Sequence, residues 1–215
     1  MTNEALRVQA RTTAPQIKIA GGLWIVAAMI IMVAAIVWIV LAVMAGDYFE
    51  SSKVIREAAT TGSDLATKRA FIESVKAWLP PLKFLGMGML LGGVTFLLAT
   101  TLGALRVGGG KVQEALGIEV KLVEPPITAK VFPMVMMMGM MVLMIAVVVG
   151  IIEGIQPYDY WNHSIATQLN PAEAGSALLA DLGTISAIKL WLEPLKFVGI
   201  AMLLSGIGLA LATIV

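Results

Sequence analysis

Four long apolar segments alternate with polar segments along this chain of 215 residues. The apolar segments cover residues 19–46, 82–105, 131–155 and 197–215. The hydrocarbon core of a bilayer is about 30 Å thick, so a spanning helix needs about 20 mostly apolar residues at about 1.5 Å each. Lipid offers no hydrogen-bond partner to the backbone, whereas a helix pairs its own N–H and C=O groups. The pattern therefore predicts an all-α integral membrane protein with four transmembrane helices.

The composition agrees with a membrane protein and excludes several functions. Hydrophobic residues make up 59% of the chain and charged residues 13%, about half the charged share of an ordinary globular protein. The net charge of +1, without a basic stripe, argues against a nucleic-acid partner. The absence of cysteine excludes disulfides and thiolate metal sites. The first apolar segment is much longer than a signal-peptide core, so we expect a retained anchor.

The sequence contains an internal repeat. Residues 76–86 read KAWLPPLKFLG and return at residues 189–199 as KLWLEPLKFVG. Over residues 76–100 and 189–213 the two stretches are identical at 15 of 25 positions, at a constant offset of 113. Apolar composition alone does not place Trp, Pro and Lys in the same register. The chain is therefore interpreted as two tandem helix–loop–helix copies.

The first and third apolar segments correspond more weakly, at an offset of 112. Lys18 aligns with Lys130, Ser52 with Ser164, and an Asp-Tyr-aromatic triplet occurs at 47–49 and again at 159–161. Because each copy holds two spans, both copies cross the membrane in the same direction. This predicts a parallel pseudo-two-fold axis along the membrane normal. An inverted repeat would need an odd number of spans in each copy.

The distribution of basic residues predicts the orientation. Lys and Arg occur in the N-terminal tail and the central connector but are absent from residues 156–187, so we expect both termini in the cytoplasm. Helices, as opposed to barrel strands, favour the cytoplasmic (inner) membrane of a prokaryote. The predicted parts are a cytoplasmic tail (1–17), repeat 1 (18–105, with spans 19–46 and 82–105 around outer loop 47–80), a cytoplasmic connector (106–130) and repeat 2 (131–215, with spans 131–155 and 197–215 around outer loop 156–193).

Both outer loops show helical periodicity. In the first, Ser63 is a candidate N-cap before an amphipathic stretch. In the second, residues 170–173 offer an Asn cap, a first-turn proline and a Glu three residues after the cap. We expect a short amphipathic helix in each loop, leading into a bend at Trp-Leu-x-Pro. Each helix lies on the membrane surface, or else the two loops pack into one small cap.

A few charged residues lie in or beside the spans. Lys83 and Lys196 are equivalent in the repeat, and Glu153 lies near the end of the third span, where the first span has Leu41. Intramembrane charge is costly and often functional. The simpler interpretation of the lysines is that their ammonium groups extend to the interface, with Glu193 as a local partner for Lys196. Asp47 and Asp159, each followed by two aromatic residues, are typical of interfacial anchors.

The third span is rich in methionine, including Met137, Met141 and Met144 on one helical face. Thioethers are soft ligands for Cu(I), so a copper site is one hypothesis, with His163 as a further candidate ligand. Packing against partner helices or bound lipid is the alternative, because Met adapts to irregular apolar surfaces. Small-xxx-small patterns predict close helix packing. They are Gly88 with Gly92, Ala201 with Ser205, and Gly150 with Gly154.

The sequence shows no phosphate-binding loop, no Ser-His-Asp order and no HExxH pattern, so we expect no enzyme. The first functional hypothesis is a non-catalytic accessory subunit of a larger membrane complex, with bound lipid and no required cofactor. The second is a small oligomeric channel or transporter that uses Lys83, Lys196 and Glu153. The third is copper handling through the Met-rich span.

Overall fold

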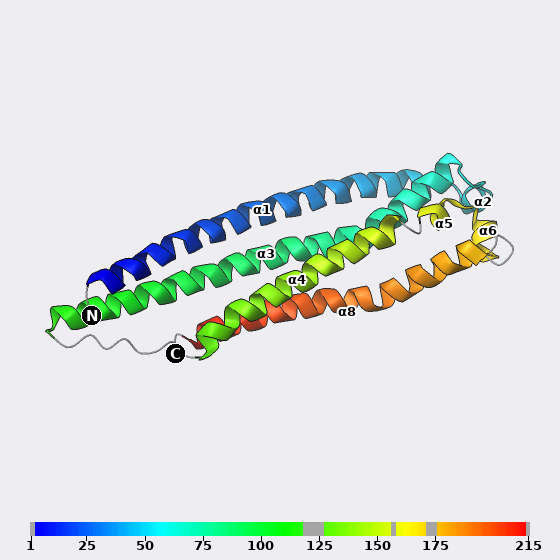
Figure 1. Cartoon of the computed structure of the whole chain (residues 1–215). Helices are drawn as coiled ribbons and strands as arrows, with labels where there is room; N and C mark the ends of the chain where they lie inside the picture. Colours follow the sequence, from blue (N-terminus) through cyan, green and yellow to red (C-terminus); the bar gives the residue numbers. More distant parts are fainter. Residues whose placement is uncertain (1–2, 118–126, 156–157, 171–175, 214–215) are drawn as a thin grey trace. The chain divides into compact units, whose positions relative to one another are not determined.

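The computed structural model describes residues 3–117, 127–155, 158–170 and 176–213. Most of these residues are helical, and none of them is in a strand. The long helices are α1 (Asn3–Glu50), α3 (Asp64–Ala115), α4 (Ile127–Ile155) and α8 (Ser176–Ala212) (Figure 1). Three short helices connect them, α2 (Lys53–Glu57), α5 (Tyr158–Asn162) and α6 (Ile165–Leu169).

The length and composition of the helices confirm the prediction of four helices able to span a membrane. Four stretches are long and apolar enough to cross a bilayer, namely Lys18–Glu50, Asp64–Ala115, Ile127–Asn162 and Ala177–Leu211. The first three contain the apolar segments 19–46, 82–105 and 131–155 and extend beyond them at both ends, and the last contains residues 197–211 of the fourth segment and begins 20 residues before it. The protein is therefore all-α, with the helices of an integral membrane protein.

The ends of these helices differ from the predicted boundaries. The amphipathic stretches expected as separate loop helices are the first parts of α3 and α8, which continue through Pro80, Pro81 and Pro194. A proline removes one intrahelical hydrogen bond and introduces a clash, but ending the helix beside apolar surroundings would leave several backbone groups unpaired. The helix therefore continues through the position of the predicted bend at Trp-Leu-x-Pro, so each amphipathic stretch and the span after it form one helix.

The connector is also more helical than expected. Residues 108–110, three consecutive glycines in the predicted connector (106–130), lie within α3. Helix-favouring residues on both sides offset the cost of about 1 kcal/mol per glycine. The helix ends at Ala115, and Gly117 follows with φ +68°, a left-handed conformation that glycine adopts freely. Pro125 and Pro126 lie outside the described residues.

The helices form two compact units, each built from parts of all four long helices. Unit 1 contains Met1–Met29, Gly86–Met141 and Val198–Val215. In it, the indole Nε1 of Trp24 donates to the carbonyl oxygen of Leu90 at 3.2 Å, which joins α1 to α3. A Cβ at Gly139 would lie 3.0 Å from the carbonyl oxygen of Gly199, so α4 and α8 approach closely at these glycines.

Unit 2 contains Ile30–Leu85 and Val142–Phe197. Its larger apolar cluster joins α1 and the first part of α3. The buried members are Ala34, Leu41, Tyr48, Ile72, Val75 and Leu79. On the other side of α3, α4 approaches at two glycines one helical turn apart. A Cβ at Gly150 would lie 3.0 Å from the carbonyl oxygen of Ala77, and a Cβ at Gly154 would lie 2.8 Å from that of Ser74.

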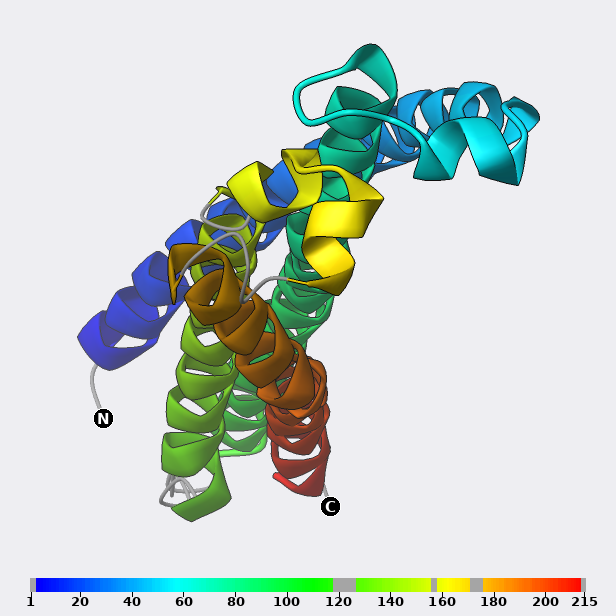
Figure 2. The same cartoon turned by 90° about the vertical axis from the view of Figure 1, so that its right-hand side faces the viewer.

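The short helices of unit 2 lie in the two predicted outer loops, α2 in the first and α5 and α6 in the second (Figure 2). The loops contact one another, because the Gly62 N–H donates to the Asn162 carbonyl at 3.1 Å and the Ser164 N–H donates to Thr61 Oγ1 at 3.1 Å. These bonds agree with the alternative in which the two loops pack together.

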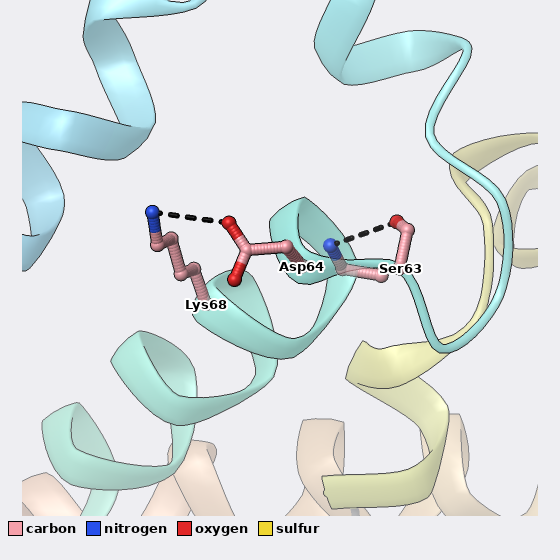
Figure 3. Close-up of polar contacts among 4 residues, drawn as sticks. Ser63, Asp64 and Lys68 are labelled. Atoms are coloured by element: carbon pink, nitrogen blue, oxygen red, sulfur yellow. Dashed lines mark hydrogen bonds and ion pairs between the residues drawn. The ribbon is translucent and has the colours of Figure 1, made fainter.

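Serine side chains begin three of the helices. The predicted cap Ser63 accepts a hydrogen bond from the Ala66 N–H at 3.3 Å, and Asp64 in the same first turn pairs with Lys68 at 3.1 Å (Figure 3). Ser52 and Ser164 cap α2 and α6 with nearly identical backbone angles (φ −59°, ψ 152° and φ −58°, ψ 151°). The cap predicted at residues 170–173 lies mostly outside the described residues, and Asn170 itself ends α6.

Candidate functional site

Unit 2 contains a charged cleft with a volume of about 290 Å³. Its walls come from the first part of α3, the end of α4 and the middle of α8. The lining residues are Glu73, Lys76, Ala77, Pro80, Glu153, Lys189, Leu192, Glu193 and Lys196. Three acids and three lysines therefore face one space, which is close in size to a small-molecule site.

Two of the lysines in the cleft are paired along their own helices. Lys76 Nζ lies 3.0 Å from Glu73 Oε1 on α3, and Lys196 Nζ lies 2.6 Å from Glu193 Oε1 on α8. Both pairs have the i,i+3 spacing of neighbours on a helix face. Lys196 is only 2% exposed, and its Nζ also lies 5.5 Å from the ring centroid of Phe84. A buried ammonium needs such partners, since burial of an isolated charge is costly.

Glu153 is the buried acid of the cleft, at 4% exposure. The next residue, Gly154, lies against Ser74 of α3, and this close approach of the two helices buries the glutamate beside it. Among the described residues, no hydrogen bond or ion pair holds its carboxylate. Lys189, the remaining lysine of the cleft, is exposed, and its Nζ lies 5.5 Å from the ring centroid of Trp161. The cleft thus has one buried anion and one exposed cation that are not paired with each other.

The other charged residues singled out in the sequence lie elsewhere in unit 2. Lys83 is exposed, with its Nζ 4.8 Å from the ring centroid of Trp38, and does not line the cleft. Asp47 and Asp159 are exposed and do not line it either. The two lysines that align at an offset of 113 therefore have different environments, one outside and one inside the cleft.

His163 lies in the contact between the two loops. Its Nδ1–H donates to the Asp159 carbonyl at 2.6 Å. Beside Arg56 and Arg69 it lines a second cavity of about 10 Å³, which is the size of one water molecule. Arg69 stacks over Trp161 at 5.2 Å. This arrangement gives His163 a role in packing the loops together.

The glycine patterns divide into two groups. Gly150 and Gly154 lie at the α3–α4 contact described above, and Gly88 and Gly92 are buried in unit 1. Ala201 and Ser205 are exposed instead. The face of α8 that packs in unit 1 carries Gly199, Leu203 and Gly206, as shown by the contacts to Gly139 and Met136 of α4. In α8 the helices therefore approach closely at Gly199 and Gly206, and not at the predicted residues Ala201 and Ser205.

The methionines of α4 mostly face outward. Met137, Met141 and Met144 are between 57% and 63% exposed, while Met136 is buried. Among the described residues, no group of three His, Asp or Glu side chains is placed to hold a metal ion. The exposed methionine face, defined here as Met137, Met141 and Met144, is therefore an apolar surface of α4.

The sequence pattern singled out Glu153, Lys196 and its partner Glu193, but it did not single out the three other charged residues of the cleft, which are Glu73, Lys76 and Lys189. The spacing of these residues could have revealed them, because side chains three and four positions apart lie on one face of a helix. The residues with this spacing are Glu73, Lys76 and Pro80 on α3, and Lys189, Glu193 and Lys196 on α8. This spacing was overlooked because the sequence predicted a separate loop helix before each bend. Residues 73 and 76 were therefore assigned to a different helix from residue 83, and residue 189 to a different helix from residue 196.

Comparison of the chain with protein-family models, curated proteins and solved structures finds no match.

Proposed function

We propose that the protein is a non-catalytic, accessory transmembrane subunit that docks the exposed methionine face of α4 onto transmembrane helices of a different subunit. The observation that carries this proposal is the composition of that face. Three long, flexible thioether side chains occupy one outward stripe of the helix. Methionine is enriched at protein interfaces, because its unbranched side chain adapts to irregular surfaces.

The first span provides a contrast within the same chain. The exposed side of α1 is mainly branched aliphatic, including Ile25, Ile36 and Ile39, which are between 55% and 65% exposed. Met29 and Met32 are also exposed on α1, but branched aliphatic residues outnumber them there, and a mainly branched face suits fluid lipid tails. Because helix association in a membrane relies on close van der Waals packing, the α4 face is the better docking surface of the two.

The proposal includes the organisation inferred from the sequence. The chain consists of two tandem copies related by a parallel pseudo-two-fold axis, with both termini in the cytoplasm and the spans in a prokaryotic inner membrane. The identical register at 15 of 25 positions supports the duplication. The matching caps at Ser52 and Ser164 also support it, because aligned residues begin aligned helices with the same geometry.

The channel hypothesis has less support from the described residues. It requires Lys83, Lys196 and Glu153 to line one path, whereas Lys83 lies outside the cleft that contains the other two. A docking subunit requires only the exposed apolar face, so it is the function we favour.

The test is a triple substitution, Met137→Ala, Met141→Ala and Met144→Ala, in the full-length chain extracted with a mild detergent. Each truncation removes the packing contacts of a side chain, about 1 kcal/mol, so three of them weaken association on the order of 100-fold. On a native gel we expect the wild-type complex with other proteins to be lost and the variant to migrate alone.

The matched control is Ile25→Ala, Ile36→Ala and Ile39→Ala, since these side chains have similar size and exposure on α1. This variant should retain the complex. Migration of the wild-type chain alone, or only as multiples of itself, contradicts the proposal. So does equal loss of the complex in the two variants.

A further inference from the structure

The cleft of unit 2 has a charge arrangement that its own residues leave incomplete. The pairs Lys76–Glu73 and Lys196–Glu193 neutralise four of its six charges. Glu153 and Lys189 remain; Lys189 and Lys196 both attract the Glu153 carboxylate, but among the described residues neither forms an ion pair or hydrogen bond with it. A largely buried carboxylate without a protein hydrogen-bond donor is costly, because burial removes much of its hydration.

We infer that this cleft binds a zwitterionic group with a primary ammonium and an anionic phosphate, as in the headgroup of an ethanolamine phospholipid. The ammonium donates to the Glu153 carboxylate, and the phosphate lies at Lys189. A primary ammonium offers N–H donors to the buried acid in charge-assisted hydrogen bonds, which a quaternary choline nitrogen does not. The cleft of about 290 Å³ holds roughly ten water-sized volumes, enough for a headgroup of about eight heavy atoms.

The depth of the two charges favours a lipid over a free zwitterion. Glu153 is buried, whereas Lys189 is exposed at the edge of the cleft. In an ethanolamine phospholipid the ammonium is the terminal group and the phosphate lies between it and the acyl chains, which is the same order. Leu190, Trp191 and Phe197 are exposed on α8 beside the lysines, at 82%, 45% and 60%. They provide an apolar surface for the acyl chains, and Trp is a common residue at headgroup depth.

The experiment measures lipid affinity of the full chain in detergent micelles, from the thermal protection given by three added compounds. These are phosphatidylethanolamine, phosphatidylcholine with the same acyl chains, and water-soluble O-phosphoethanolamine. For the wild-type chain we expect phosphatidylethanolamine to bind on the order of 10-fold more tightly than phosphatidylcholine, since charge-assisted hydrogen bonds are the difference. O-Phosphoethanolamine should bind more weakly than the lipid.

Glu153→Gln should remove the preference for ethanolamine, because the neutral amide no longer pairs with the ammonium. Lys189→Gln should weaken both lipids on the order of 10-fold, since both carry the phosphate, and this exposed position tests the site without altering a buried residue. Glu57→Gln is the control outside the cleft, a half-exposed acid paired only with Lys53, and should bind like the wild type.

Equal protection by the two lipids in the wild-type chain overturns the inference. An ethanolamine preference that persists in Glu153→Gln, or unchanged binding in Lys189→Gln, overturns it as well. O-Phosphoethanolamine that protects as well as the lipid at the same concentration overturns the assignment to a membrane lipid. None of these outcomes depends on the docking face of α4.

Discussion

The contact of Gly154 with α3 leads to a quantitative prediction. Replacement of Gly154 by alanine would place a Cβ 2.8 Å from the carbonyl oxygen of Ser74 and 3.2 Å from Cδ1 of Trp78. The oxygen belongs to the backbone of α3, so the clash is relieved only by moving one helix away from the other. Overpacking of this kind costs about 1–3 kcal/mol. It also disturbs the wall of the cleft that buries Glu153.

Alanine also favours a helix over glycine by up to about 1 kcal/mol, and this gain must be separated from the clash. Gly183 of α8 provides the reference, because a Cβ there meets nothing within 4 Å. Gly183→Ala should stabilise the protein by about 0.5–1 kcal/mol. Gly154 lies next to the end of α4, so its own propensity gain is no larger. The free energies of unfolding of the two variants should therefore differ by at least about 1–3 kcal/mol.

The assay is reversible unfolding by increasing mole fractions of sodium dodecyl sulfate in mixed micelles, followed by far-UV circular dichroism. We expect a lower midpoint for Gly154→Ala than for the wild type and a higher midpoint for Gly183→Ala. If Gly154→Ala unfolds at or above the midpoint of Gly183→Ala, then the α3–α4 approach at this glycine is not a close contact. The description of the cleft wall would then be wrong.

Two further predictions concern the caps and the methionines. Ser52→Ala and Ser164→Ala should each weaken a helix cap by about 1 kcal/mol. Hydrogen exchange of the α2 amides in the first variant, and of the α6 amides in the second, should therefore accelerate about 5-fold. Clearly unequal effects would argue against equivalent caps. The triple variant Met137→Leu, Met141→Leu and Met144→Leu should bind as much copper after Cu(I) loading as the wild type, because the α4 thioethers face outward. The control Met29→Leu with Met32→Leu on α1 should also leave the copper content unchanged. Loss of copper from the α4 variant alone would support the copper hypothesis.

The long elements of the fold followed from the sequence because their physical cause is local. An apolar stretch of about 20 residues has few alternatives to a helix in lipid. The cap at Ser63 was predictable for the same reason, since its hydrogen bond joins residues three positions apart. The continuation through Pro80 and Pro81 was not predictable in this way. It depends on the balance between one proline clash and a whole unpaired helix end, and the surroundings of that segment decide it.

The candidate site was only half predictable because it depends on which helix faces meet. Glu153 and Lys196 were conspicuous in the sequence as charges in or beside apolar segments. The sequence indicated an acidic partner for Lys196 alone, since Glu193 aligns with Pro80. It did not indicate that Lys196 would face a cleft and that Lys83 would lie over Trp38. That difference arises from the packing of α4 at Gly150 and Gly154 against α3, which is a contact between residues more than 70 positions apart.

The two proposed copies therefore share a framework but differ in charge at the positions that form the cleft. Where the second copy has Glu153 and Glu193, the first has Leu41 and Pro80 at the aligned positions. The conserved lysine of the motif thus gains an acidic partner in the second copy, where Lys196 pairs with Glu193, while Lys83 lies over an aromatic ring. Burial of a charge is costly. If Glu153 and Glu193 served only packing, they would have no advantage over Leu41 and Pro80, the aligned residues of the first copy. Residues 73–80 of the first proposed copy form one wall of the cleft, and the second copy supplies Glu153 and Lys189. We therefore propose that the duplicated framework builds the cleft and that the charges specific to the second copy adapt it to a ligand.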